Sequence, residues 1–232
     1  MIKRAVGFSL FMGLLLLSGC DAQPSDEAIS QDGDGAKAKI GGIITFGSYE
    51  QDGDTNNGQE PIEWRVLAVE NGHALIISDK LLDAKAYNRD FVDITWEKCT
   101  LRSWLNEGFA EAAFTDEEKK AILVTDLVNE GNREYAVDGG NPTQDKIFLL
   151  SIDEAKRYFS GDDDKIAFTT PYAEKQGVGV KNGKGWWWLR SPGDDAEYTM
   201  CVRHDGSFFE TGRSVHLDYN GVRPALWLDM PI

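Results

Sequence analysis

The sequence has few of the residues that usually build catalytic or metal centres. It contains three cysteines and three histidines in 232 residues, and none of them stands in a zinc-binding spacing such as H-E-x-x-H or C-x-x-C. It also contains neither a G-x-S-x-G nucleophile motif nor a G-x-x-x-x-G-K-[ST] phosphate loop. We therefore nominate no catalytic residue and predict no cofactor, apart from the calcium candidate described below.

Basic side chains are scarce as well. Lysine and arginine number 24 against 39 aspartates and glutamates, which gives a formal net charge of -15. An excess of this size repels phosphate backbones over most of the surface, so we expect no nucleic-acid partner. Hydrophobic residues make up 41% of the chain, which excludes an intrinsically disordered protein.

The N-terminus has the pattern of a secretory signal. Two basic residues precede the apolar run Ala5–Leu17, which is shorter than the roughly 20 residues that a membrane span needs. The run ends in Leu-Ser-Gly-Cys, which resembles the lipobox of bacterial lipoproteins. That resemblance implies that the Cys20 thiol receives fatty-acyl chains such as palmitate and that the preceding peptide is removed. The alternative is an ordinary signal peptide with an incidental cysteine.

The lipobox resemblance predicts three parts and a location. Residues 1–20 would be the signal peptide, 21–39 a flexible acidic linker, and 40–232 a single globular domain. Acylated Cys20 would make the lipid bilayer a partner, because two or more acyl chains anchor a protein stably. The protein would then be extracytoplasmic, on the cell membrane or the outer membrane.

Strand patterns dominate both ends of the globular part. Ile43–Tyr49 and Ile62–Val69 are rich in β-branched and aromatic residues, and the dipeptide Asn71-Gly72 predicts a tight hairpin to the next apolar run. Further strand patterns run from Trp186 to Leu228.

Helix patterns occupy the middle of the chain. Apolar spacing predicts a helix from Leu101 to Ala113 that breaks at Gly108. Ser/Thr-x-x-Glu patterns predict two more helix starts, at Thr115 and Ser151.

Two shorter strands, Ile122–Val128 and Lys146–Leu150, are predicted between these helices, and two long loops at Asn129–Asp145 and Ser160–Gly185. The fold class is therefore α+β, with mixed, mainly antiparallel sheets, short helices in the middle, and chain ends that meet in one sheet.

Five ordered blocks resemble a known bacterial family. They include Lys146 to Ala155 (K-I-F-L-L-S-I-D-E-A), Trp187 to Gly193 (W-W-L-R-S-P-G) and Gly221 to Leu228 (G-V-R-P-A-L-W-L). Together the blocks, from about Ile43 to Leu228, resemble DUF6273, a domain of unknown function in secreted and lipid-anchored proteins. The last two blocks also resemble the C-type-lectin-like fold of formylglycine-generating enzymes and ligand-binding receptors. The first resemblance implies a habitat and an architecture without a reaction.

Two cysteines remain for the domain. Cys99 and Cys201 are a candidate disulfide, since exported proteins often contain paired cysteines and the bridge would close a loop of about 100 residues. The alternative is two separate buried thiols that act as small hydrophobic residues.

One polar loop is a weak candidate for calcium. Asp52, Asp54, Asn56 and Glu63 fall at positions 1, 3, 5 and 12 of a possible calcium loop, with oxygen ligands that suit the ion. The glycine stands one position late and the flanking segments are strands, so a polar hairpin loop is the favoured interpretation.

Arginines inside apolar blocks and one run of tryptophans are the candidates for binding. Arg65, Arg102, Arg190 and Arg223 need carboxylate or carbonyl partners if buried, and structural pairing is favoured over anion recognition. Trp186, Trp187 and Trp188 alternate faces in a strand, so at least one indole should leave the core. We nominate these tryptophans and Arg190 as ligand-binding residues.

The sequence thus favours a lipid-anchored cell-envelope protein with a non-catalytic binding domain for an extracellular glycan or peptide. The Trp186–Trp188 strand and the Ser160–Gly185 loop would form its site. The alternatives are an enzyme of unknown chemistry on a formylglycine-generating-enzyme-like fold, and a structural envelope protein.

Overall fold

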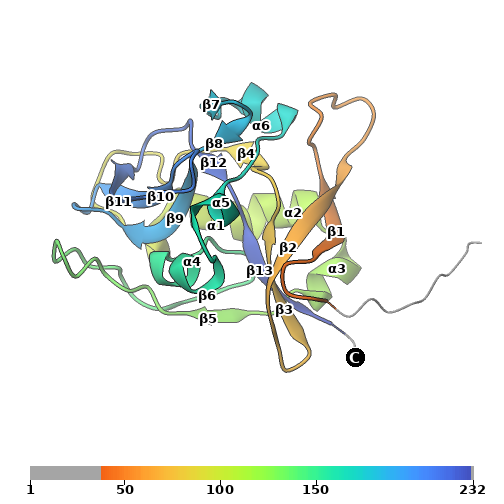
Figure 1. Ribbon diagram of the computed structural model, residues 1–232, viewed down its shortest axis with the longest axis horizontal. Helices are drawn as coiled ribbons and strands as arrows, with labels where there is room; N and C mark the ends of the chain where they lie inside the picture. The colour runs from red at the N-terminus through yellow and green to blue at the C-terminus, as the bar shows by residue number, and fades with distance from the viewer. Residues whose placement is uncertain (1–37, 231–232) are drawn as a thin grey trace, which may run out of the picture. The chain divides into compact units, whose positions relative to one another are not determined.

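The computed structural model describes residues 38–230, and strands from the two ends of this range share one sheet (Figure 1). This four-stranded antiparallel sheet has the order β1-β2-β3-β13. Its strands are β1 (Ile43–Tyr49), β2 (Glu60–Glu70), β3 (His73–Ser78) and β13 (Ala225–Asp229). The prediction that the chain ends meet in one sheet is confirmed.

The predicted hairpin at Asn71-Gly72 is also confirmed. Asn71 and Gly72 join β2 to β3 with φ angles of 52° and 83°, so both residues adopt the left-handed conformation that a type I′ turn requires. The dipeptide therefore sets the pairing of β2 with β3 next to the turn, as far as the irregularity between Val66 and Ala68.

A second sheet of five strands has the order β11-β10-β9-β12-β4, with one parallel pair, β12 and β9. Its strands are β4 (Asp83–Ala84), β9 (Trp187–Pro192), β10 (Tyr198–Val202), β11 (Phe208–Ser214) and β12 (Gly221–Val222). Two small antiparallel pairs complete the strands: β5 (Thr125–Leu127) with β6 (Thr143–Asp145), and β7 (Val180–Lys181) with β8 (Lys184–Gly185). The α+β class is confirmed.

In the sequence, the short helices lie between β4 and β7. They are η1 (Trp96–Lys98), α1 (Thr100–Trp104), η2 (Leu105–Phe109), α2 (Ala110–Ala113), α3 (Asp116–Ala121), α4 (Ile152–Tyr158), α5 (Asp162–Lys165) and α6 (Pro171–Gln176). In Figure 1, α1 and α2 lie between β9–β11 on the left and β1–β3 on the right. No helix within 38–230 is long and apolar enough to cross a bilayer.

The predicted helix break at Gly108 is wrong. The helical path continues from α1 to α2 through η2, which is a π-helical turn. A Cβ atom at Gly108 would lie 3.1 Å from the Trp104 ring, so this glycine lets the indole pack closely instead of ending the helix.

Both predicted capping boxes are confirmed. The side chain of Thr115 caps α3 together with Glu118, and that of Ser151 caps α4 together with Glu154. In each pair the hydroxyl accepts the N3 backbone N–H, and the glutamate accepts the N-cap N–H.

Other sequence boundaries were wrong. Residues 146–150 are not a strand: β6 precedes them, and Ile147–Leu150 pass through the core, where Phe148 bridges to Ala225. The predicted loop Ser160–Gly185 contains α5, α6, β7 and β8. Residues 147–150 are buried on all sides, so their sequence has no alternation of polar and apolar residues that would distinguish a strand from another core segment. The elements within 160–185 are too short to show a hydrophobic periodicity.

Candidate functional site

Neither face of β9 exposes an indole, because every residue of the strand, Trp187 and Trp188 included, is buried. The indole N–H groups of Trp187 and Trp188 donate to the main-chain carbonyls of Lys165 (3.0 Å) and Lys85 (2.8 Å). β9 lies between β10 and β12, and both of its faces are covered. Trp187 and Trp188 are therefore core residues, and their predicted contact with a ligand is wrong. Trp186 precedes β9 and is half-buried.

Arg190, the fourth residue predicted to contact a ligand, is buried and structural. Its guanidinium forms a bidentate pair with Glu154, with Nη2 donating to Oε1 across 2.8 Å. Its Nη1 also donates to the carbonyl of Leu149 at 2.8 Å. Because Glu154 belongs to the capping box of α4, one carboxylate fixes both that helix start and β9. The prediction of ligand binding by Arg190 is wrong, and its structural pairing is confirmed.

Structural pairing also holds for Arg65 and Arg223. Arg65 donates to Asp79 at 3.2 Å. Arg223 is fully buried, and its Nε and Nη1 donate to the carbonyls of Ser78 (2.9 Å) and Lys165 (3.1 Å). Burial lowers the pKa of the Arg223 guanidinium, because desolvation disfavours its charged form.

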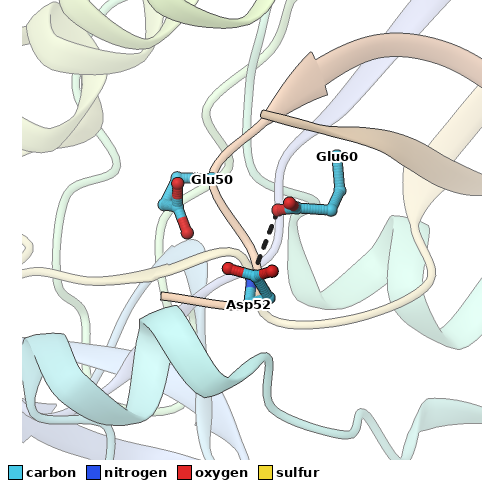
Figure 2. A group of neighbouring side chains, drawn as sticks. All are labelled: Glu50, Asp52 and Glu60. Carbon is cyan, nitrogen blue, oxygen red and sulfur yellow. Dashed lines mark hydrogen bonds between the residues drawn. The ribbon is translucent and has the colours of Figure 1, made fainter. Parts of the chain in front are cut away.

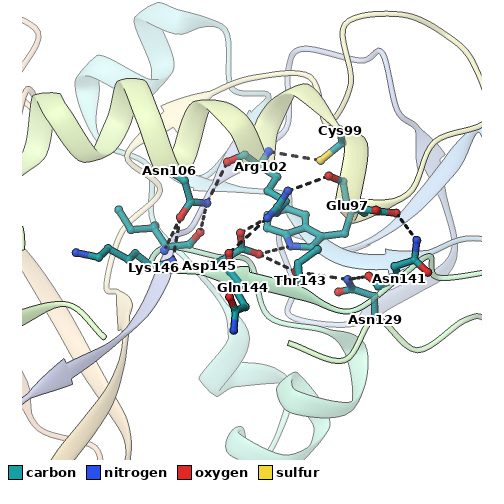
Figure 3. A network of polar contacts seen from close by, with 12 residues as sticks. Glu97, Cys99, Arg102, Asn106, Asn129, Asn141, Thr143, Gln144, Asp145 and Lys146 are labelled. Atoms are coloured by element: carbon teal, nitrogen blue, oxygen red, sulfur yellow. Dashed lines mark hydrogen bonds and ion pairs between the residues drawn. The ribbon is translucent and has the colours of Figure 1, made fainter. Parts of the chain in front are cut away.

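Arg102 belongs to a larger polar network, which Figure 3 shows between α1 and β6. The buried Asp145 carboxylate accepts from Arg102 Nε (2.7 Å), Trp96 Nε1 (3.0 Å) and Thr143 Oγ1 (2.9 Å). Arg102 Nη1 also donates to the carbonyl of Glu97 at 2.9 Å. The carboxylate is satisfied by internal donors, so this network holds the helix to the strand.

The disulfide proposed for Cys99 and Cys201 is absent. Both thiols are free and buried, in different parts of the fold. Cys99 precedes α1, where its sulfur accepts the backbone N–H of Arg102, while Cys201 lies in β10 between β9 and β11. Burial raises the pKa of each thiol to about 12. The alternative of two small hydrophobic residues is therefore the correct one.

The calcium candidates do not converge. Asp52 and Asp54 each accept a backbone N–H two residues ahead, from Asp54 (2.6 Å) and Asn56 (3.1 Å), so they stabilise the turn. Glu63 lies in β2, where its carboxylate is 4.0 Å from Lys80 Nζ. Asp54 and Glu63 do not group with Asp52 among the carboxylates of residues 38–230 that lie close enough together to share an ion, so the structure does not assemble the predicted calcium loop.

Asp52 instead lies near Glu50 and Glu60, as Figure 2 shows. Glu60 Oε2 accepts the backbone N–H groups of Gln51 (2.7 Å) and Asp52 (3.2 Å), and Glu50 Oε1 accepts that of Gly53 (2.6 Å). Hydrogen bonds to Asp54 and Asn57 lower the pKa of Asp52. These carboxylates organise the loop between β1 and β2.

A surface hollow of about 290 Å³ lies beside Trp186, and we call it the Trp186 hollow. It is lined by Gly179, Val180, Lys181, Trp186, His204, Arg213 and Tyr219. Gly179, Val180 and Lys181 belong to β7 or directly precede it, and Trp186 directly precedes β9. His204 follows β10, Arg213 lies in β11, and Tyr219 precedes β12. The Gly179 N–H donates to the Tyr219 carbonyl at 2.9 Å and so joins two of these segments. The loop and tryptophan that the sequence paired do meet here.

Trp186 organises the hollow rather than presenting a bare ring. Its Nε1–H donates to His204 Nδ1 at 3.1 Å. The Arg213 guanidinium lies 4.7 Å from the Trp186 ring and 4.4 Å from the Tyr219 ring, and Arg213 Nη1 donates to Asn220 Oδ1 at 2.9 Å. Sequence reasoning missed Arg213, His204 and Tyr219, because no motif relates residues in three separate segments.

A larger hollow of about 450 Å³ lies beside Trp104. Lys85 Nζ lies over the Trp104 ring, 4.4 Å from its centre. His216 also lines the hollow, and His216 Nδ1 lies 2.8 Å from Ser214 Oγ. Sequence reasoning missed this pair, since its only signal is a spacing of two residues near the end of a strand. Among residues 38–230, no carboxylate lies within ion-pair distance of His216.

Comparison with known proteins gives one match. The family model for a domain of unknown function, DUF6273, matches residues 71–230. No curated protein and no solved structure matches. The expected C-type-lectin-like fold stays a prediction.

Proposed function

The chain belongs to the DUF6273 family, whose description names no function, and we propose that this member is a non-catalytic binding module. The domain binds an extracellular glycan or peptide in the Trp186 hollow. It is held on the outer face of a membrane by acyl chains on Cys20, which lies outside the described residues.

One observation carries this proposal. The Trp186 hollow combines two aromatic side chains with three side chains that donate hydrogen bonds, Lys181, His204 and Arg213. Aromatic rings supply contact area at a low cost in conformational entropy, and a few converging polar groups supply orientation. Tyr219 is 37% exposed, so part of its ring is free to contact a ligand.

The location rests on the sequence. The Leu-Ser-Gly-Cys ending at Cys20 supports acylation, and the polar segment 21–39 supports a linker between anchor and domain. Outside the cytoplasm, recognition of external molecules is a commoner task than chemistry that needs a soluble nucleotide.

An array experiment tests the proposal. Full-length protein in detergent would be applied to glycan and peptide arrays, together with the variants Tyr219→Ala and Tyr135→Ala. Tyr135 is the matched control, because it is 41% exposed and lies outside the hollow. We expect a ligand class that Tyr219→Ala loses and Tyr135→Ala retains. If no array ligand depends on Tyr219, the Trp186 hollow is not the binding site.

A second candidate, an enzyme, is favoured by the contact between Ser214 and His216 beside the larger hollow. A serine hydroxyl next to an imidazole is the first part of a nucleophile and its base. A fluorophosphonate probe tests it: covalent labelling that Ser214→Ala abolishes would favour the enzyme, and no labelling of the native protein would argue against it.

A further inference from the structure

The charged side chains of the Trp186 hollow are all basic. Lys181 and Arg213 line it together with His204, and no carboxylate of residues 38–230 does. This is unusual in a protein with 39 acidic and 24 basic residues. Dissolved salt screens exposed charges that lie more than about 8 Å apart at physiological ionic strength, so the nearby groups dominate the electrostatic potential at a ligand in the hollow.

Arg213 has no carboxylate partner among the described residues, although Arg65, Arg102 and Arg190 all do. Its guanidinium is nevertheless fixed between the Trp186 and Tyr219 rings, and one of its five N–H donors is bonded to Asn220. A cation that is already ordered loses little conformational entropy when it binds an anion, and its planar fork matches a carboxylate.

His204 adds a second donor whose identity the geometry fixes. The Trp186 indole is a donor only, so His204 Nδ1 must accept from it. In the neutral imidazole the proton then lies on Nε2, which leaves an N–H donor on a ring that lines the hollow. Arg203, whose guanidinium is 5.5 Å from the Trp186 ring, adds positive charge nearby and also has no carboxylate partner within 38–230.

The chemistry of the lining distinguishes between ligand classes. Toward a ligand, the free polar side-chain groups of Lys181, Arg213 and His204 are donors, because His204 Nδ1 already accepts the Trp186 N–H. The Tyr219 hydroxyl both donates and accepts. A peptide brings a backbone N–H at each residue that would need an acceptor, whereas sugar hydroxyls can themselves accept. The volume of about 290 Å³ is just below the usual range for ligand pockets, which suits a single ring.

We infer that the ligand of the Trp186 hollow is an acidic sugar, a ring whose carboxylate binds Arg213 and whose face contacts Tyr219. This inference rests on the proposed function and names its substrate class. The hollow would bind the neutral form of the same sugar more weakly, because the guanidinium would then have no anionic partner.

Calorimetric titration of the full-length protein in detergent tests the inference with matched probes. The probes are galacturonic acid, a single acidic ring, and its methyl ester, in which the carboxylate is replaced by a neutral ester. A short peptide with a free C-terminal carboxylate and the same peptide as its amide test the other carboxylate source. We expect the acid sugar to bind at least about tenfold more tightly than its ester, since a charge-assisted bond is lost.

Three variants separate charge, geometry and folding. Arg213→Gln should abolish the preference for the acid, and Arg213→Lys should restore part of it because it keeps charge without the fork. Arg133→Gln is the control, because its side chain is 89% exposed and outside the hollow. Melting curves would show that each variant is folded.

Four outcomes would overturn the inference. They are equal binding of acid and ester, no binding of the acid, tighter binding of the peptide acid, and a preference for the acid that survives Arg213→Gln. In each case the proposed function survives if the arrays yield a ligand that depends on Tyr219, and it fails with the inference if they yield none.

Discussion

Trp186 donates its indole N–H to Nδ1 of His204 across 3.1 Å, whereas the next residue, Trp187, donates to the main-chain carbonyl of Lys165 in the core. These two adjacent tryptophans therefore have different structural roles. Trp186 positions a half-buried imidazole, and Trp187 completes the packing of β9.

This difference predicts unequal costs of truncation. Trp187→Ala should lower the free energy of unfolding by about 3–5 kcal/mol, because it leaves a cavity in place of a fully buried ring. Trp186→Ala should cost clearly less, since its ring is only half-buried. Guanidinium unfolding followed by circular dichroism measures both. Equal losses would place Trp186 in the core and remove it from the binding site.

Arg190→Ala should lower the free energy of unfolding by about 3 kcal/mol, because it leaves the Glu154 carboxylate without its partner. We expect the lower end of the range for buried pairs, since the Glu154 side chain is 28% exposed. Arg133→Ala removes an exposed ion pair and should change the free energy of unfolding by less than about 0.5 kcal/mol. A melting curve of Arg190→Ala that matches the native one would contradict the structural role.

The buried thiols predict a loss of stability in alkaline solution. Their pKa values are raised from 9.0 to about 12 in the folded protein, so the unfolded chain loses these protons first. Stability from each thiol is complete below pH 9 and falls as the pH rises from about 9 to 12. At pH 10 each should have lost about 1.4 kcal/mol.

Urea midpoints of native protein and Cys201→Ala, compared at pH 8 and pH 10, measure this loss. The variant should be less stable at both values but should fall by less between them. An identical fall in both proteins would show that the Cys201 thiol does not retain its proton.

Cys20→Ala should release the protein from the membrane fraction into the medium or the periplasm, because acyl chains on this residue are the proposed anchor. Fractionation and immunoblotting measure the distribution, and Cys201→Ala is the control. If Cys20→Ala stays with the membrane after a salt wash, the lipoprotein hypothesis is wrong.

The sequence predicted the features that neighbouring residues determine. Asn71 and Gly72 specify a turn by themselves, and Thr115 with Glu118 specifies a helix start. The burial of both Trp187 and Trp188 could not be predicted this way, because it depends on segments that cover both faces of β9.

The Trp186 hollow was only half predicted for the same reason. Trp186 and the preceding loop were identified from composition, but Arg213 and Tyr219 reach the hollow through the pairing of β10 with β11 and the return of the chain to β12. Such placement is a property of the two-sheet topology and has no signal in local spacing.

The family match begins at Asn71, within the turn that joins β2 to β3. A polypeptide cut to that match would lack β1 and β2, and one side of β3 would then present unpaired backbone groups along the apolar run Ala74–Ile77. Such an edge is a template for self-association. Protein expressed from Asn71 onward should therefore aggregate through β3, and the smallest independently folding unit extends upstream of the family boundary to include β1.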